Sequence, residues 1–257
     1  MARSDSVALS AARSDFDEAV GRVQAHTPIA YFKLGTEEEG LGFDEIAFIR
    51  EVAPASVDVV VKIGGPCARN DMRQASRLGA AGLVGPMIES AYALRHFVEA
   101  AHEEFPAARH LGINLETISA VRALDDFLAL PAVRSLTFIN IGRSDLAGSL
   151  GLAVGDAAMH EVVCDVAARV RAAGIPIHVG GKVTVGTLGP VMKRVGLDGY
   201  HTRFLAFGAP EVAPPQTVVP LALRLEIALL RLLAGRFEER AEAHLERARI
   251  TASRLEG

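Results

Sequence analysis

Two acidic residues, Glu116 and Asp145, stand at the ends of consecutive predicted strands, where side chains can do chemistry. Glu116 ends the apolar run 110–116, and Asp145 follows the run 135–142. If these are neighbouring parallel strands, spaced at about 4.8 Å, the two carboxylates lie roughly 5–10 Å apart. Such a pair suits a hard divalent cation such as Mg²⁺. The alternative is that Glu116 caps the next helix and Asp145 caps a loop.

Basic residues also follow predicted strands. Lys62 ends the second predicted strand, and Arg203 lies within the last one. A cation that points into a site is costly unless it is paired, so each implies an anionic substrate or an acidic partner. The alternative to substrate binding is a structural ion pair with a glutamate of 37–39 or with Glu116.

Other polar residues near strand ends are weaker candidates. Lys182 follows two glycines in a late loop, which in α/β barrels often binds phosphate. His178 and His201 could be general bases, or hydrogen-bonded core residues. The loop 142–151 is rich in small residues, so the backbone around Gly142, Arg143 and Ser144 could bind a carboxylate or phosphate. Cys67 follows a Gly-Gly-Pro turn and stays unassigned, because no histidine is near it in sequence.

Seven short apolar runs alternate with amphipathic segments, a pattern typical of a parallel sheet. The runs are 29–35, 56–64, 82–88, 110–116, 135–142, 175–181 and 199–207. No glycine-rich phosphate loop follows the first run, and polar residues recur at strand ends throughout. Both features favour a TIM-type (β/α)8 barrel over an open doubly wound sheet. An eighth strand is not evident, and 6–10 is a weak candidate.

The chain has 257 residues, the size of one α/β barrel. We expect a barrel domain over 1–215 and a C-terminal helical extension over 216–257. The extension begins with a helix that is apolar on most faces, so we expect it to join copies of the chain as a dimer, trimer or hexamer. The alternative is that this helix packs on the barrel's own last layer.

Composition excludes several classes of protein. A net charge of −4 gives no basic signal for nucleic acid, and two cysteines exclude a disulfide scaffold. The apolar stretch 218–235 contains Arg224, Glu226 and Arg231, which argues against a membrane span. The first twenty residues show no apolar leader segment, so we expect a cytoplasmic protein.

Together these motifs resemble the HpcH/HpaI aldolase and citrate lyase family. The likeness lies in VVVKIGG (59–65), ASRLGAAGLVGPMIES (75–90), INLET (113–117) and INIGRSDLAGSLGL (139–152). The resemblance implies an α/β barrel with a divalent metal on Glu116 and Asp145. Mg²⁺ is the first choice, with Mn²⁺ or Co²⁺ as alternatives.

The resemblance also implies an activity and an assembly. The activity is that of a carbon–carbon lyase or aldolase: a pyruvate-like 2-oxo acid reacts through a metal-stabilised enolate, with an aldehyde or acyl co-substrate. Family members form hexamers from dimers that exchange C-terminal helices, which fits the apolar tail.

Three positions depart from the family pattern. Lys62 replaces an arginine and cannot grip a carboxylate with two parallel hydrogen bonds. Glu38 falls nearest the usual catalytic histidine, and acidic neighbours could raise its pKa into the range of a base. Arg143 replaces a proline. The predicted catalytic residues are Lys62, Glu38 and Arg203, and the predicted substrate-binding residues are Gly142, Arg143, Ser144, Lys182 and His201.

Two other functions remain open at this point. A lysine aldolase would form a Schiff base through Lys33, Lys62 or Lys182, all near strand ends. A non-catalytic barrel would bind an anionic metabolite and use its helical tail for assembly.

Overall fold

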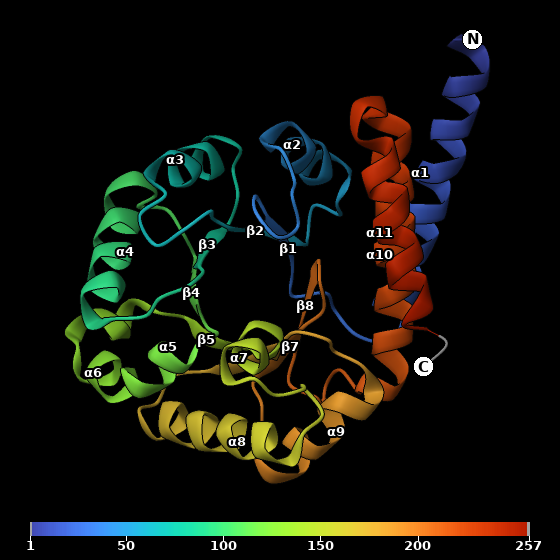
Figure 1. Ribbon diagram of the computed structural model, residues 1–257. Coiled ribbons are helices and arrows are strands. Elements are labelled where there is room, and N and C mark those ends of the chain that lie inside the picture. The colour runs from blue at the N-terminus through green and yellow to red at the C-terminus, as the bar shows by residue number, and fades with distance from the viewer. Residues whose placement is uncertain (1, 256–257) are drawn as a thin grey trace. The chain divides into compact units, whose positions relative to one another are not determined.

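A computed structural model describes residues 2–255, and within them residues 30–210 form a closed barrel (Figure 1). The strands occur around the barrel in chain order. They are β1 (Tyr31–Gly35), β2 (Asp58–Lys62), β3 (Gly82–Gly85), β4 (His110–Leu115), β5 (Phe138–Gly142), β6 (Ile177–Gly180), β7 (Gly199–His201) and β8 (Leu205–Gly208). Each lies within one of the apolar runs or overlaps its end, so the predicted α/β barrel of TIM type is confirmed.

The last strand departs from a fully parallel barrel. Strands β1 to β7 pair in parallel, whereas β8 is antiparallel to both β7 and β1. The single strand predicted over 199–207 is therefore two strands joined by a tight turn, in which the Thr202 N–H donates to the Leu205 carbonyl at 2.9 Å. The missing eighth strand is the second half of this hairpin, and 6–10 lie instead in helix α1 (Ala2–Gln24).

Helices surround the barrel on its outside (Figure 1). They are α2 (Phe43–Val52), α3 (Arg69–Arg77), α4 (Ala91–Glu104), α5 (Ile118–Arg122), α6 (Leu124–Ala129), the 3₁₀ helix η1 (Pro131–Ser135), α7 (Arg143–Leu150), α8 (Ala157–Ala172) and α9 (Val185–Arg194). Helix α4 shows why they form. The Ser90 hydroxyl caps it by accepting from the Ala93 N–H, and Leu94, Phe97 and Val98 bury one face.

The inside of the barrel changes from apolar to polar along the strands. A buried cluster from five strands fills the middle: Tyr31, Val60, Val84, Phe138 and Ala206. Because residues two apart in a strand share a face, the next inward positions toward the carboxyl ends are Lys33, Lys62 and Asn140. The polar residues therefore gather at the carboxyl-terminal end of the barrel, which we call the mouth.

A second unit consists of helices. Residues 1–29 group by contacts with 211–257, rather than with the barrel. Helix α1 packs against α10 (Pro215–Arg236), which packs against α11 (Ala241–Ser253) after the 3₁₀ helix η2 (Glu238–Arg240). This division differs from the expected boundary at residue 215, because α1 buries Phe16, Val20 and Val23. Oligomerisation through these helices stays a prediction.

In the part of the chain that the structure describes, no helix combines the length and apolarity that crossing a membrane requires.

We predict that Gly112→Ala destabilises the barrel by about 1–3 kcal/mol. A Cβ at Gly112 would lie 2.2 Å from the ring of Phe138, inside the barrel. Urea unfolding followed by circular dichroism measures the change.

The matched control is Gly148→Ala. Gly148 is exposed in α7, and a Cβ there meets nothing within 4 Å, so this change should be neutral or stabilise by up to about 1 kcal/mol. Equal effects of the two substitutions would contradict the close packing inside the barrel.

Candidate functional site

A buried carboxylate lies between two lysines at the mouth. Glu39 Oε1 is 3.3 Å from Lys33 Nζ, and Glu39 Oε2 is 2.8 Å from Lys62 Nζ. The Glu39 side chain is only 4% exposed, and the lysines are 10% and 11% exposed. The structural ion pair considered for Lys62 is therefore present, and Lys33 shares it.

The loop after β1 places Glu39 by turning back on its own strand. Gly40 has a φ of +57°, which glycine adopts without strain, and the Leu41 N–H donates to the Gly35 carbonyl. The Glu39 carboxylate then lies directly against Gly35, where a Cβ would be 2.0 Å from Oε2. A glycine at the end of β1 is what makes room for this carboxylate.

The two lysines determine the charge state of Glu39. Burial raises the pKa of Glu39, but the charges of Lys33 and Lys62, with a hydrogen bond from Lys62, bring it down to about 2. Glu39 is thus ionised throughout the physiological range. It neutralises one of the two ammonium groups and leaves one positive charge at the mouth.

Glu116 lies just beyond β4 and is held in a fixed position. Its Oε1 accepts from the Met87 N–H at 2.9 Å, and its Oε2 accepts from Asn114 Nδ2 at 3.0 Å. Asn140 Nδ2 in turn donates to Asn114 Oδ1 at 2.9 Å. Glu116 does not cap the following helix, because Thr117 does so.

The environment of Glu116 raises the pKa of its carboxyl group. It is 4% exposed, and burial is the main cause. The charge of Asp145 raises its pKa further, while the hydrogen bonds from Met87 and Asn114 and the charge of Lys62 oppose the change. The charges of Asp145 and Lys62 therefore both act on Glu116, and a metal shared by Glu116 and Asp145 stays a prediction.

Asp145 lies in the first turn of α7, which begins directly after β5. Its side chain is exposed, in contrast to that of Glu116. Gly142, at the end of β5, has no side chain where Glu116 lies: a Cβ there would be 2.7 Å from Glu116 Oε2. Gly142 thus lets the Glu116 carboxylate lie against the start of the element that carries Asp145.

Arg143, the first residue of α7, binds the segment that runs from the end of β6 into α9. Its side chain is fully buried, and its guanidinium donates to three backbone carbonyls, those of Gly180, Gly181 and Thr187. Burial lowers the pKa of Arg143 to about 10, which still leaves it charged. Three of its five N–H groups thus serve backbone carbonyls inside the protein, and the substrate contact predicted for Arg143 stays a prediction.

Ser144 lies in the first turn of α7, and Lys182 lies in the loop between β6 and α9. Gly181, with a φ of +78°, approaches so closely that a Cβ would be 2.5 Å from the Ser144 nitrogen. Lys182 is exposed and has a positive φ of +45°. Their predicted contacts with substrate remain predictions.

Arg203 and Glu38 lie at the rim of the mouth. Arg203 belongs to the β7–β8 turn, and its Nη1 is 4.0 Å from Glu38 Oε1. The Glu38 side chain is 75% exposed, so of the three consecutive glutamates it is Glu39, not Glu38, that is buried. The sequence pattern did not distinguish Glu39 from the two glutamates before it. Gly35 and Gly40, on either side of it, were the available signal, because they permit a tight turn of the loop.

His201 is a core residue below the mouth. Its Nε2 lies 3.0 Å from both the Tyr31 hydroxyl and His178 Nδ1, and its ring is 1% exposed. Burial, with the nearby charges of His178 and Lys33, lowers the pKa of His201 well below its usual value. Burial also lowers the pKa of His178 to about 4. Their lowered pKa values make both imidazoles weak bases, which favours the core-residue alternative over a general base.

The donor set at the mouth fits a hard divalent cation bound mainly by substrate and water. Glu116 and Asp145 are the carboxylates that would hold it, consistent with Mg²⁺, which takes one or two protein carboxylates. Among residues 2–255 no cluster of three or more histidine, cysteine, aspartate or glutamate ligands exists, so a closed protein cage is absent there.

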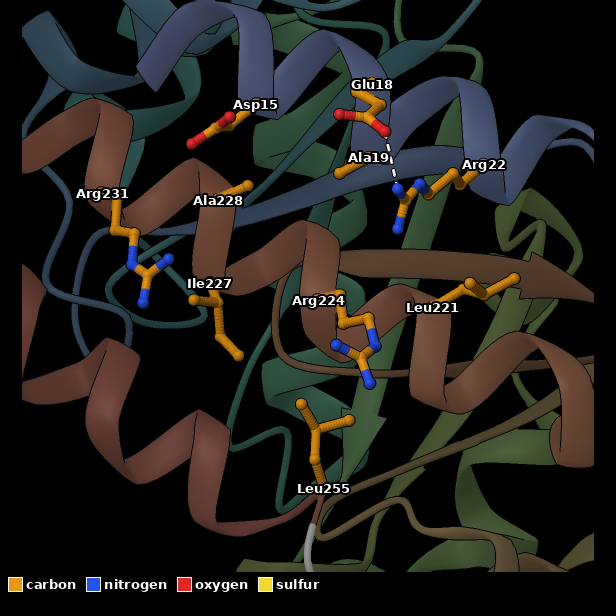
Figure 2. A pocket seen from close by; sticks show the side chains of 10 residues that line it. All are labelled: Asp15, Glu18, Ala19, Arg22, Leu221, Arg224, Ile227, Ala228, Arg231 and Leu255. Carbon is orange, nitrogen blue, oxygen red and sulfur yellow. Dashed lines mark hydrogen bonds and ion pairs between the residues drawn. The ribbon is translucent and has the colours of Figure 1, made fainter. Parts of the chain in front are cut away.

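A cavity of about 300 Å³ lies elsewhere, in the helical unit (Figure 2). Helices α1 and α10 and Leu255 line it. Its charged residues include Asp15, Glu18 and two arginines seven residues apart, Arg224 and Arg231. Glu18 pairs with Arg22 at 2.6 Å. This cavity is lined by no strand end and by none of the predicted site residues.

Comparison with known proteins supports the fold. No protein-family model and no curated protein sequence matches the chain. Solved structures do. An HpcH/HpaI aldolase from Desulfitobacterium hafniense DCB-2 superposes with a TM-score of 0.57 at 18% identity, over 73% of this chain and 82% of that one. An HpcH/HpaI aldolase/citrate lyase family protein from Burkholderia cenocepacia J2315 gives 0.56 at 18% identity, over 77% and 83%.

A macrophomate synthase gives a TM-score of 0.54 at 16% identity, over 74% of each chain. At these identities the likeness establishes a shared fold. Proteins of the family that the sequence motifs resemble are thus found among the structural neighbours, and this chain shares their fold.

We predict that Glu39→Gln destabilises the protein by about 3–5 kcal/mol, because it leaves two buried ammonium groups without a carboxylate. The neighbouring Glu38→Gln is the matched control and should change stability by less than about 0.5 kcal/mol, since Glu38 is exposed. Urea unfolding of both variants measures the difference, and similar effects would contradict the role of Glu39.

We also predict an acid-dependent loss of stability that depends on Glu39. The pKa of this group is lowered from 4.5 to about 2 in the folded state, so its contribution is complete above pH 4.5 and is lost as the pH falls toward 2. The stability difference between the parent and Glu39→Gln should shrink by about 3 kcal/mol over that interval. Urea midpoints measured at successive pH values test this. A difference that stays constant with pH would refute it.

Proposed function

We propose that the chain is a divalent-metal-dependent carbon–carbon lyase or aldolase that acts on a pyruvate-like 2-oxo acid. The observation that carries this proposal is the position of Glu116. A buried carboxylate at the end of β4, fixed by Met87 and Asn114 and interacting with Asp145, lies at the mouth of a barrel that shares its fold with HpcH/HpaI aldolases.

The charges at the mouth favour a cation together with an anionic substrate. Lys33 and Lys62 contribute two positive charges there, and Glu39, Glu116 and Asp145 contribute three negative ones when ionised. The remaining single negative charge attracts a divalent cation, which would leave one positive charge. A monoanionic 2-oxo acid then balances the site.

The residues of the mouth have separate tasks in this proposal. When bound, Mg²⁺ supplies Lewis-acid stabilisation of negative charge on the 2-oxo oxygen. Asn140 and Asn114 keep Glu116 oriented through their chain of hydrogen bonds. Lys62 lies near Glu116 and attracts the substrate carboxylate, as a point charge rather than a two-pronged grip.

In this proposal, residues at the rim of the mouth carry out the proton transfer. For cleavage, Glu38 accepts the proton of the hydroxyl group next to the scissile bond. The carbon–carbon bond breaks, the hydroxyl carbon becomes an aldehyde, and the electron pair stays on the 2-oxo acid as an enolate. Arg203, 4.0 Å from Glu38, positions that carboxylate. His201 takes no part, because it is buried and its lowered pKa makes it a weak base.

The structure gives the Schiff-base alternative little support. Lys33 and Lys62 both lie against the buried Glu39 carboxylate, so either nitrogen would have to leave that contact to attack a carbonyl group. Treatment with pyruvate and borohydride distinguishes the two mechanisms by mass spectrometry. We expect no covalent adduct on any lysine.

We predict that pyruvate binds in the presence of Mg²⁺ and that EDTA abolishes the binding. Glu116→Gln and Asp145→Asn should each weaken Mg²⁺-dependent binding by more than about tenfold, because each removes a carboxylate that the cation needs. Isothermal titration calorimetry of the full chain measures this.

Asp126→Asn is the matched control, since Asp126 is exposed on the outer helix α6. It should leave binding unchanged. Pyruvate binding that needs no metal and survives both mouth substitutions would instead support the non-catalytic barrel.

A further inference from the structure

A cysteine and a histidine from two different elements lie in contact on the outside of the barrel. Cys67 lies in the loop between β2 and α3, and His96 lies on α4, 29 residues further along the chain. Cys67 Sγ is 2.9 Å from His96 Nδ1, and the cysteine is exposed. This contact supplies the histidine partner that the sequence around Cys67 did not reveal.

The surrounding residues hold the imidazole in place. The Tyr92 ring stacks on the His96 ring, with centroids 5.7 Å apart and an angle of 17° between the planes. The Arg95 guanidinium lies over the other aromatic ring, 5.5 Å from the centroid of Tyr92. The position of His96 is therefore supported by a small stack on the surface of α4.

Ion pairs fasten the two elements that carry the pair. Arg69, two residues after Cys67, binds Glu103 at 2.6 Å and Glu104 at 3.0 Å, and both glutamates lie on α4. Arg73 binds Glu104 as well, at 3.0 Å. These contacts join α3 to α4, and the packing of these two helices brings the thiol close to the imidazole.

We propose that Cys67 and His96 form a reactive thiol–imidazole pair, and that Cys67 is a modification site for soft electrophiles. With its proton on Nε2, His96 accepts the thiol proton at Nδ1 as the sulfur attacks. With an alkyl iodide the carbon–sulfur bond forms, the carbon–iodine bond breaks and iodide leaves. The proton remains on His96. This inference does not depend on the proposed lyase reaction.

The other cysteine provides a contrast within the same chain. Cys164 is buried in α8, and burial raises the pKa of its thiol. Because the thiolate is the reactive form, Cys164 should react slowly in the folded protein.

The loop that carries Cys67 connects this residue to the mouth of the barrel. The same loop follows Lys62 at the mouth, and its Gly64 N–H donates to Asp71, which also accepts from the Thr36 hydroxyl of the loop after β1. A group added to Cys67 therefore lies on a loop that is hydrogen-bonded into the rim of the mouth.

The test is the labelling rate of each cysteine with iodoacetamide, measured on the full chain by quenched mass spectrometry. We expect Cys67 to react at least about tenfold faster than Cys164 and faster than Cys67 itself in urea-unfolded protein. His96→Gln and His96→Asn should each slow the labelling of Cys67 about tenfold or more, because both remove the base.

His102→Gln is the matched control, since His102 is an exposed histidine on the same helix, and it should leave the rate unchanged. Circular dichroism confirms that the variants are folded. Labelling of Cys67 that is unaffected by both His96 substitutions, or no faster than in the unfolded chain, would overturn the proposal.

Discussion

The pairing of one buried carboxylate with two buried lysines is the constraint on which the mouth of this barrel depends. Lysine ammonium groups remain inside a barrel only if an opposite charge compensates for lost hydration. Glu39 provides that charge from a loop and not from a strand. The loop after β1 must therefore fold inward, and Gly35 and Gly40 are what permit it.

A second set of contacts fixes the opposite side of the mouth. Arg143 binds one carbonyl at the end of β6 and two beyond it, and Gly142 leaves space for the Glu116 carboxylate. These contacts use backbone atoms and glycines rather than charged partners. They hold α7, and with it Asp145, in one position relative to β4. The acidic pair is thus kept on a rigid base while its exposed member remains open to solvent.

The sequence predicted the barrel well because strands that are buried on both faces are apolar along most of their length. Six of the seven predicted strands match observed ones, and the seventh differs only because the polar turn at Thr202 and Arg203 divides it into a hairpin. The grouping of α1 with the tail was not predictable, since it depends on contacts between residues about 200 positions apart.

The same distinction applies to the site residues: positions at strand ends follow from the strand pattern, whereas side-chain contacts between separate segments do not. Glu116 and Asp145 could be grouped from the sequence because strand ends converge by geometry alone, and their role as metal ligands stays a prediction. The choice among three consecutive glutamates was not, because only the loop conformation decides that Glu39 turns inward and Glu38 outward. The contacts of the Arg143 side chain were not predictable either, because its partners are backbone carbonyls, which every residue carries. The Cys67–His96 contact likewise joins two separate elements.

The central claim is that the carboxylates of Glu116 and Asp145 jointly bind a cation beside an anionic keto acid. Anomalous X-ray diffraction from crystals soaked with Mn²⁺ and pyruvate tests it most directly. We expect one strong anomalous peak between the two carboxylates, with the pyruvate carboxylate on the Lys62 side. A peak at any other position, with these two carboxylates free of metal, would contradict the claim.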